Sequence, residues 1–216
     1  MEQFVNYSSV VIPIDRSNVD TDALIPKQFL KSVEKSGFGD NLFDEWRYLD
    51  QGEPGQDCSD RPLNTDFVLN KKAYRGGRIL LARDNFGCGS SREHAVWALR
   101  DFGIRTVIAG SYADIFFNNC FKNGVLPISL PGADIDALFA QDAESGPCSM
   151  DIDLERQTAT AESGQVYRFE IDGFKKQCLL EGLDDIALTL QHEGDIATYE
   201  QRRMNDVPWL FEDLAS

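Results

Sequence analysis

The residues best suited to chemistry are two serines and an arginine that follow a glycine-bearing loop. Asp84 to Gly89 is polar and carries two glycines, and Ser90, Ser91 and Arg92 come directly after it. A short apolar run, Ile79 to Ala82, precedes the loop and is typical of a buried strand, and apolar residues at helical spacing follow. The sequence therefore predicts strand, loop and helix N-terminus, where free N–H groups and the helix dipole favour an anion. Two hydroxyls and a planar guanidinium suit a carboxylate or a phosphate.

Other interpretations of this stretch compete with the anion site. Ser90 and Glu93 have the spacing of a capping box, which requires no function. A dinucleotide-binding fingerprint requires a third glycine where Arg92 stands, and a phosphate-binding loop requires Gly-Lys-Ser/Thr, which is absent. A hydrolase elbow requires a glycine two places after its serine, and Ser90 has Arg92 there. On the residues alone, the anion site and the capping box both stay open.

Several stretches together carry a resemblance to a known family. The run Asn85 to Ala95 (NFGCGSSREHA) resembles the signature of the swivelling domain of the aconitase superfamily. Within it, the resemblance to the small subunits of 3-isopropylmalate dehydratase is close. Further stretches resemble that family in the same order: Asn18 to Leu30, Gly37 to Arg47, Tyr112 to Asn119 and Gly182 to Leu190. The ordered series is far more specific than any one motif.

The resemblance implies roles for individual residues. Ser90 would be the catalytic base, acting as an alkoxide, while Ser91 and Arg92 bind a substrate carboxylate. Asp22 stands where the superfamily keeps an active-site aspartate near the serine. The loop from Gly37 to Arg47 would face the substrate's side chain, and its apolar members are Phe38, Leu42 and Phe43.

The implied reaction interconverts 2-isopropylmalate and 3-isopropylmalate through 2-isopropylmaleate in leucine biosynthesis. The dehydration needs a base, cations for two carboxylates and a Lewis acid. In the family the Lewis acid is a 4Fe–4S cluster held by three cysteines of a separate large subunit, so the chain is expected to bind no metal or cofactor alone and to be active only in a hetero-oligomer. Two alternatives stay open: a related hydratase for homoaconitate or a methylated malate, and a non-catalytic anion-binding regulatory subunit.

Composition limits the partners. The 216 residues carry 21 Lys and Arg against 36 Asp and Glu, a net charge of −15, which argues against nucleic acid and anionic membranes. An anionic substrate must therefore be held by a local cluster of cations. The chain lacks a signal-peptide pattern and a membrane-length apolar run, which predicts a soluble cytoplasmic protein. Its five scattered cysteines predict reduced thiols, and Cys88 has no assigned role.

The expected fold is an α/β, aconitase-type swivelling β/β/α domain with a central parallel sheet and additional antiparallel strands. Strand and helix patterns alternate from Ile79 to Leu130, which predicts right-handed crossovers. Ligands of such sheets bind at the carboxyl ends of strands, where Asp84 to Arg92 lies. We expect a single domain over 1–216 with a surface insertion near 50–64. The other predicted elements are strands at 10–14, 150–154 and 166–171 and helices at 113–123, 134–141, 173–181 and 186–203; Pro208 to Phe211 fits either a docking segment or a packed terminus.

Overall fold

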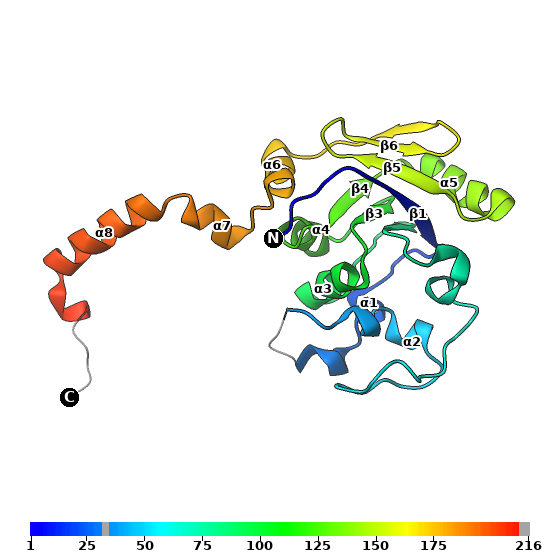
Figure 1. Cartoon of the computed structure of the whole chain (residues 1–216), viewed down its shortest axis with the longest axis horizontal. Coiled ribbons are helices and arrows are strands. Elements are labelled where there is room, and N and C mark those ends of the chain that lie inside the picture. Colours follow the sequence, from blue (N-terminus) through cyan, green and yellow to red (C-terminus); the bar gives the residue numbers. More distant parts are fainter. Residues whose placement is uncertain (32–34, 212–216) are drawn as a thin grey trace.

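Four short apolar runs form the parallel half of a seven-stranded sheet, ordered β4-β3-β2-β1-β5-β6-β7 (Figure 1). The computed structural model describes residues 1–31 and 35–211. Every residue of β2 and β3 is buried, as expected for parallel strands covered on both faces. The parallel strands are β1 (Tyr7–Ile14), β2 (Ile79–Ala82), β3 (Thr106–Ala109) and β4 (Leu126–Ser129). The predicted central parallel sheet is confirmed.

β1 joins the parallel and antiparallel halves of the sheet. Its first half, Tyr7 to Val10, pairs antiparallel with β5, and its second half, Val11 to Ile14, pairs parallel with β2. Pro13 therefore lies in a part of the strand that has a partner on one side alone. That placement suits a residue without an N–H donor.

The antiparallel half contains one strand that the sequence pattern did not predict. β5 (Ser149–Asp153), β6 (Thr158–Ala161) and β7 (Val166–Arg168) form a meander. The strands predicted at 150–154 and 166–171 do not pair with each other, because β6 lies between them. The sequence of β6, Thr-Ala-Thr-Ala, has no large apolar residue, so its alternation is a weak signal for a strand.

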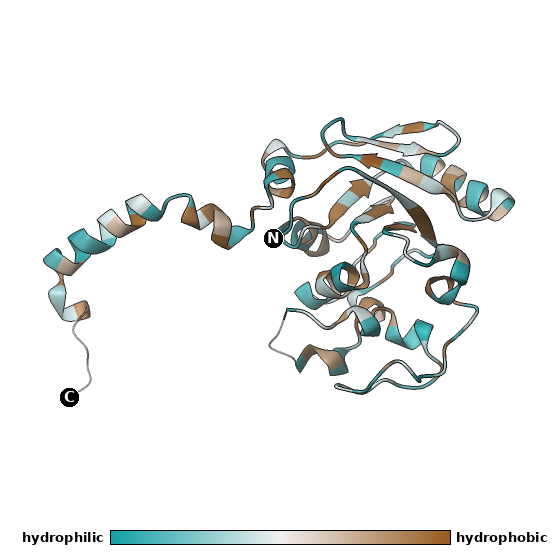
Figure 2. Cartoon of the chain, viewed as in Figure 1, coloured by the Kyte–Doolittle hydropathy of each residue, from teal (hydrophilic) through white to brown (hydrophobic). Residues whose placement is uncertain are grey.

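Helices cover both faces of the sheet. α3 (Glu93–Phe102) and α4 (Asp114–Lys122) connect β2 to β3 and β3 to β4. Alternate strand residues point to opposite faces. Leu80 and Val107 pack with α3, while Leu81 and Ile108 pack with the helices of the other face. Brown, hydrophobic segments are concentrated on the central strands in Figure 2. The remaining α-helices are α1 (Thr21–Leu24), α2 (Asp44–Arg47), α5 (Gly132–Ser145), α6 (Gly173–Glu181), α7 (Asp185–Leu190) and α8 (Glu193–Asp206).

The end of the chain projects from this body (Figure 1). The helix predicted at 186–203 is divided into α7 and α8, with a break at Gln191 and His192. A 3₁₀ turn, η5 (Pro208–Leu210), follows α8. We call residues 185–210 the arm. The described residues include no helix that is long and apolar enough to cross a membrane.

Residues 50–64, the predicted insertion, are attached to the body by a buried ion pair between Arg61 and Asp44. Arg61 Nη1 donates to Asp44 Oδ2 at 2.5 Å and Arg61 Nε donates to Asp50 Oδ1 at 3.1 Å. The Arg61 and Asp44 side chains are almost fully buried. Removal of either one would therefore leave the other as an unpaired buried charge, which is strongly destabilising. The single-domain organisation stays a prediction, and residues 32–34 and 212–216 lie outside the described part of the chain.

Candidate functional site

Two loops that follow neighbouring parallel strands build the site. The loop after β1 and the loop after β2 run side by side and exchange backbone hydrogen bonds. Gly87 N donates to Val19 O at 2.7 Å, and Thr21 N donates to Cys88 O at 2.9 Å. The site thus lies at the carboxyl ends of β1 and β2, as predicted.

Left-handed backbone shapes the loop after β2. Asn85, Gly87 and Gly89 have φ of 59°, 74° and 92°. A Cβ added to Gly87 would overlap the ring and Cβ of Phe116 in α4. Gly87 is therefore required twice, by its φ and by the close approach of α4.

The capping box is absent from the structure. α3 begins at Glu93, and Arg92 holds the N-cap position without a side-chain capping bond. Glu93 Oε1 instead accepts from Asn123 Nδ2 at 2.9 Å. Ser90 and Ser91 precede the helix in exposed loop, so neither hydroxyl is used to cap α3. Both hydroxyls are therefore available for chemistry.

A cavity of about 260 Å³ brings the predicted serines and arginine together. One wall is the loop after β2, with Ser90, Ser91 and Arg92. The first turn of α4, with Asp114 and Ile115, also lines the cavity. Its volume is near the lower end of the range for small-molecule sites. The described lining residues are Thr21, Gly87, Gly89, Ser90, Ser91, Arg92, Ala113, Asp114, Ile115 and Phe116.

Asp22 and Thr21, in the loop after β1, form hydrogen bonds with the loop after β2. Arg92 Nη1 donates to Asp22 Oδ1 at 2.5 Å, and the Arg92 side chain is only 14% exposed. This bond uses one of five guanidinium N–H donors, so Asp22 orients a cation that has further donors. Thr21 Oγ1 donates to Ser90 O at 2.9 Å, and Thr21 is buried. Sequence reasoning missed Thr21 and Asp114; the position of Thr21 inside the Asn18 to Leu30 motif was the available signal.

The apolar loop of 37–47 lies in the core and not along the cavity. Phe38, Leu42 and Phe43 are at most 3% exposed, and none of them lines the cavity. Phe38 packs edge-on against His94, with ring centroids 5.3 Å apart, and Phe43 stacks on Trp46. The structure thus gives these three side chains a packing role, because removing large apolar side chains from water lowers the free energy of the folded chain. Their contact with substrate stays a prediction.

His94 and Cys88 take no part in the cavity lining. His94 packs on Trp97 as well as Phe38. Burial, followed by the charge of Asp20, raises the pKa of the Cys88 thiol, which disfavours the reactive thiolate. Among residues 1–31 and 35–211, no group of three or more His, Cys, Asp or Glu side chains is arranged to hold a metal ion.

The fold and site define a class of protein. The family model for the aconitase C-terminal domain matches residues 1–133, and the LeuD_N model matches residues 136–173. The model for the C-terminal domain of the 3-isopropylmalate dehydratase small subunit matches residues 185–213. A solved structure from Methanocaldococcus jannaschii, titled 3-isopropylmalate dehydratase, has a TM-score of 0.64 at 23% identity and covers 90% of this chain and 99% of that one. The fold is that of the aconitase swivelling class.

Full-length relatives narrow the class to one family. The 3-isopropylmalate dehydratase small subunit of Magnetococcus marinus is 61% identical over 213 residues, 99% of this chain and 100% of the relative. That of Aromatoleum aromaticum is 59% identical over 211 residues, 98% of this chain and 99% of the relative. The chain belongs to the 3-isopropylmalate dehydratase small-subunit family, whose members serve a hydro-lyase of leucine biosynthesis, and the resemblance seen in the sequence is confirmed.

Proposed function

We propose that Ser90 is the base of the isopropylmalate isomerisation and that Ser91 and Arg92 bind a substrate carboxylate. The observation that supports this most directly is the cavity, which all three residues line together. Ser90 has no capping role, and the Arg92 guanidinium nearby favours an oxyanion over a neutral hydroxyl. A substrate held between Ser90 and the first turn of α4 would place its C–H within reach of the Ser90 oxygen.

Asp22 acts in this proposal through Arg92. Its carboxylate fixes the guanidinium against the loop after β1, so that the plane of Arg92 is set before substrate arrives. In a chain of net charge −15, a pre-oriented local cation is what draws a dicarboxylate into the site. Asp22 is thus a positioning residue, and the substrate is a small dicarboxylate.

The Lewis acid belongs to the partner in this proposal. The described residues offer no cluster of thiols or carboxylates that fits an iron–sulfur cluster. We assign the 4Fe–4S cluster to the large subunit, which the family name implies as partner. When bound there, it would polarise the departing hydroxyl. The five cysteines of this chain are free thiols, which fits a reducing cytoplasmic location.

The test is kinetic, with the chain co-purified with the large subunit of the same organism. The complex should interconvert the two isopropylmalates, and Ser90→Ala should lower kcat and kcat/KM together by about 10²–10⁴-fold with KM little changed. Because Ser90 caps no helix, the S90A variant should unfold at the same temperature as the wild type. An S90A enzyme with near-normal kcat would refute the base and support a non-catalytic anion site. Faster turnover of homoaconitate or a methylated malate would favour the related-hydratase alternative.

A further inference from the structure

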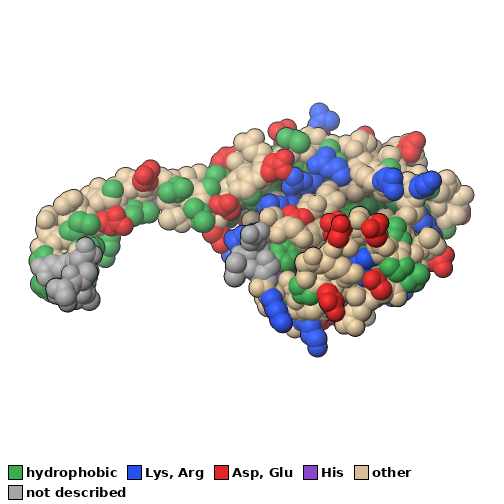
Figure 3. Space-filling view, turned by 60° about the horizontal axis from the view of Figure 1, so that its bottom comes forward, with side chains coloured by type: hydrophobic (Ala, Val, Ile, Leu, Met, Phe, Trp, Pro, Cys, Tyr) green, Lys and Arg blue, Asp and Glu red, His purple; other side chains and the backbone are tan. Residues whose placement is uncertain are grey.

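The arm leaves an unusual amount of apolar side chain in water. No residue of α7, α8 or η5 is buried. Ile186, Leu190, Tyr199, Trp209 and Leu210 are each between 59% and 69% exposed. In the space-filling view the arm stands clear of the body, with hydrophobic side chains along it (Figure 3). The tail is therefore not a packed terminus, which leaves the docking interpretation of Pro208 to Phe211.

An arm of this kind has few contacts of its own to stabilise it. α8 has 14 residues, and isolated helices of that length are marginal in water. Exposed apolar surface concentrated in one segment marks an interaction site. Tyr and Trp, which contribute most to interface energies, are among the exposed side chains of the arm.

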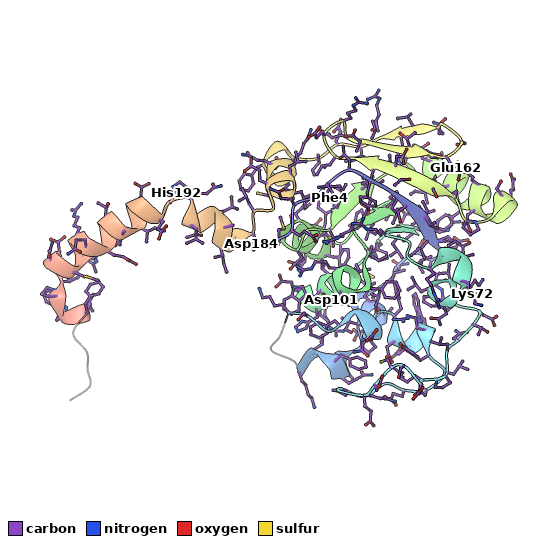
Figure 4. All side chains as sticks on the ribbon, in the orientation of Figure 1. Phe4, Lys72, Asp101, Glu162, Asp184 and His192 are labelled. Atoms are coloured by element: carbon purple, nitrogen blue, oxygen red, sulfur yellow. The ribbon has the colours of Figure 1, made fainter. Side chains whose placement is uncertain are left out.

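The root of the arm is anchored to the body. The Asp184 side chain caps α7 by accepting from Ala187 N at 2.9 Å. Lys122, at the end of α4, donates to Asp185 Oδ2 at 2.8 Å. Figure 4 labels Asp184 at this root and His192 at the break between α7 and α8. The arm is thus attached to the helix that forms one wall of the cavity.

α4 makes the cavity and the arm one continuous surface. Asp114 and Ile115 of its first turn line the cavity, and Lys122 of its last turn holds the arm. The exposed residues of α4 are these three and Asn118, which share one face of the helix. Nine residues span about 13 Å. A partner that covers the cavity along this face therefore reaches the root of the arm.

We infer that the arm is a docking element for the large subunit; this rests on the proposed function, in which that subunit completes the cavity. The arm has its own family match at 185–213, separate from the aconitase-type match at 1–133, so it is an addition to the shared body. A second copy of this chain is a poorer occupant. Residues 185–210 hold five acidic side chains against two basic ones in a chain of net charge −15, so two arms repel.

The experiment compares an arm variant with a matched control in binding to the purified large subunit. The arm variant is Tyr199→Ser with Trp209→Ser, and the control is Val166→Ser, which removes an exposed apolar side chain from β7. The arm variant should raise the Kd for the large subunit at least about tenfold, as expected for interface aromatics, and V166S should leave it unchanged. Both free variants should unfold at the wild-type temperature, and kcat at saturating large subunit should be unchanged. Amides of α8 should gain hydrogen-exchange protection in the wild-type complex.

The outcomes separate the two proposals. An arm variant that binds as tightly as the wild type overturns the arm's role and leaves the proposed function standing. Self-association of the free chain that the arm variant abolishes, with unchanged affinity for the large subunit, shows a second copy as occupant and also overturns it. A wild-type chain that neither binds nor activates the large subunit overturns the proposed function together with this inference.

Discussion

Arg92 is the only cation among the described residues that line the cavity. In the proposed complex it lies between two carboxylates, Asp22 of its own chain and that of the substrate. A planar guanidinium serves both because its N–H donors form a fork with two usable edges. An ammonium group at the same position has one centre of charge and no second edge.

Arg92→Lys is expected to raise KM because the two-edged contact is lost while the charge remains. A smaller fall in kcat should accompany it, since the substrate is then oriented less well. Asp22→Asn keeps the size of the side chain. If Asp22 acts through Arg92, this variant should also have a raised KM and a smaller fall in kcat, both weaker than in R92K. Steady-state kinetics of both variants in complex with the large subunit test this. A fall in kcat alone for D22N would instead indicate direct chemistry at Asp22.

Gly87 provides a test of the loop geometry. Gly87→Ala should lower the free energy of unfolding by about 1–2 kcal/mol for the left-handed backbone and by about 1–3 kcal/mol more for the contact with Phe116. Gly55→Ala is the matched control, since Gly55 has φ of +79° and an added Cβ would meet no atom within 4 Å, so only the backbone cost remains. Urea denaturation of both variants gives the difference. Equal losses would show that α4 moves away without cost.

At the scale of elements, the loop of 37–47 is attached to the C-terminal end of α3. Phe38 N donates to Asp101 Oδ2 at 3.1 Å. Arg47 Nη1 donates to the carbonyl oxygens of Gly39, Asp40 and Leu42, which closes the loop on itself. These bonds hold the loop in one shape against α3, as expected for a packing role.

Leu42→Ala separates packing from substrate contact. Leu42 is fully buried, so the change should lower the free energy of unfolding by about 2–5 kcal/mol. The preference for isopropyl- over methyl-substituted malate should stay the same at temperatures where the variant is folded. Leu49→Ala, at a site 72% exposed, is the control and should change stability by less than about 0.5 kcal/mol. If the substrate preference of the L42A variant changed tens-fold, the result would support the predicted contact between this loop and the substrate.

For the whole molecule, the site is divided between two chains in the proposed function. The small subunit supplies the base and a carboxylate clamp, and the large subunit supplies the Lewis acid and the other walls. A division of this kind couples activity to assembly, because neither chain holds all the groups that the dehydration requires.

The chain purified alone should therefore be folded, inactive and free of iron and sulfide. Addition of the cluster-loaded large subunit should restore turnover in proportion to complex formed. Iron and acid-labile sulfide analysis of the isolated chain, with circular dichroism to verify folding, is the measurement. Stoichiometric iron and sulfide in the isolated chain would contradict the shared site.

The sequence by itself determined the local elements and the family to which the chain belongs. The apolar run at 79–82 coincides with β2, because a run this short that leads into a glycine-bearing loop is typical of a buried strand. The motif around Ser90 also placed the chain in its family. These features depend on neighbours in the chain, which a sequence displays directly.

Tertiary structure decided what depends on distant contacts. The Glu93 carboxylate accepts from Asn123, 30 residues away, and forms no capping box with Ser90, and the Thr21 bond to Ser90 joins loops 69 residues apart. Phe38, Leu42 and Phe43 lie in the core because α3 and Trp46 provide apolar side chains for this loop to pack against. β6 forms a strand because it pairs with its neighbours in the sheet, although its own sequence has only a weak strand pattern. The arm remained exposed because nothing in the described chain covers its apolar side chains, a fact that only the folded arrangement reveals.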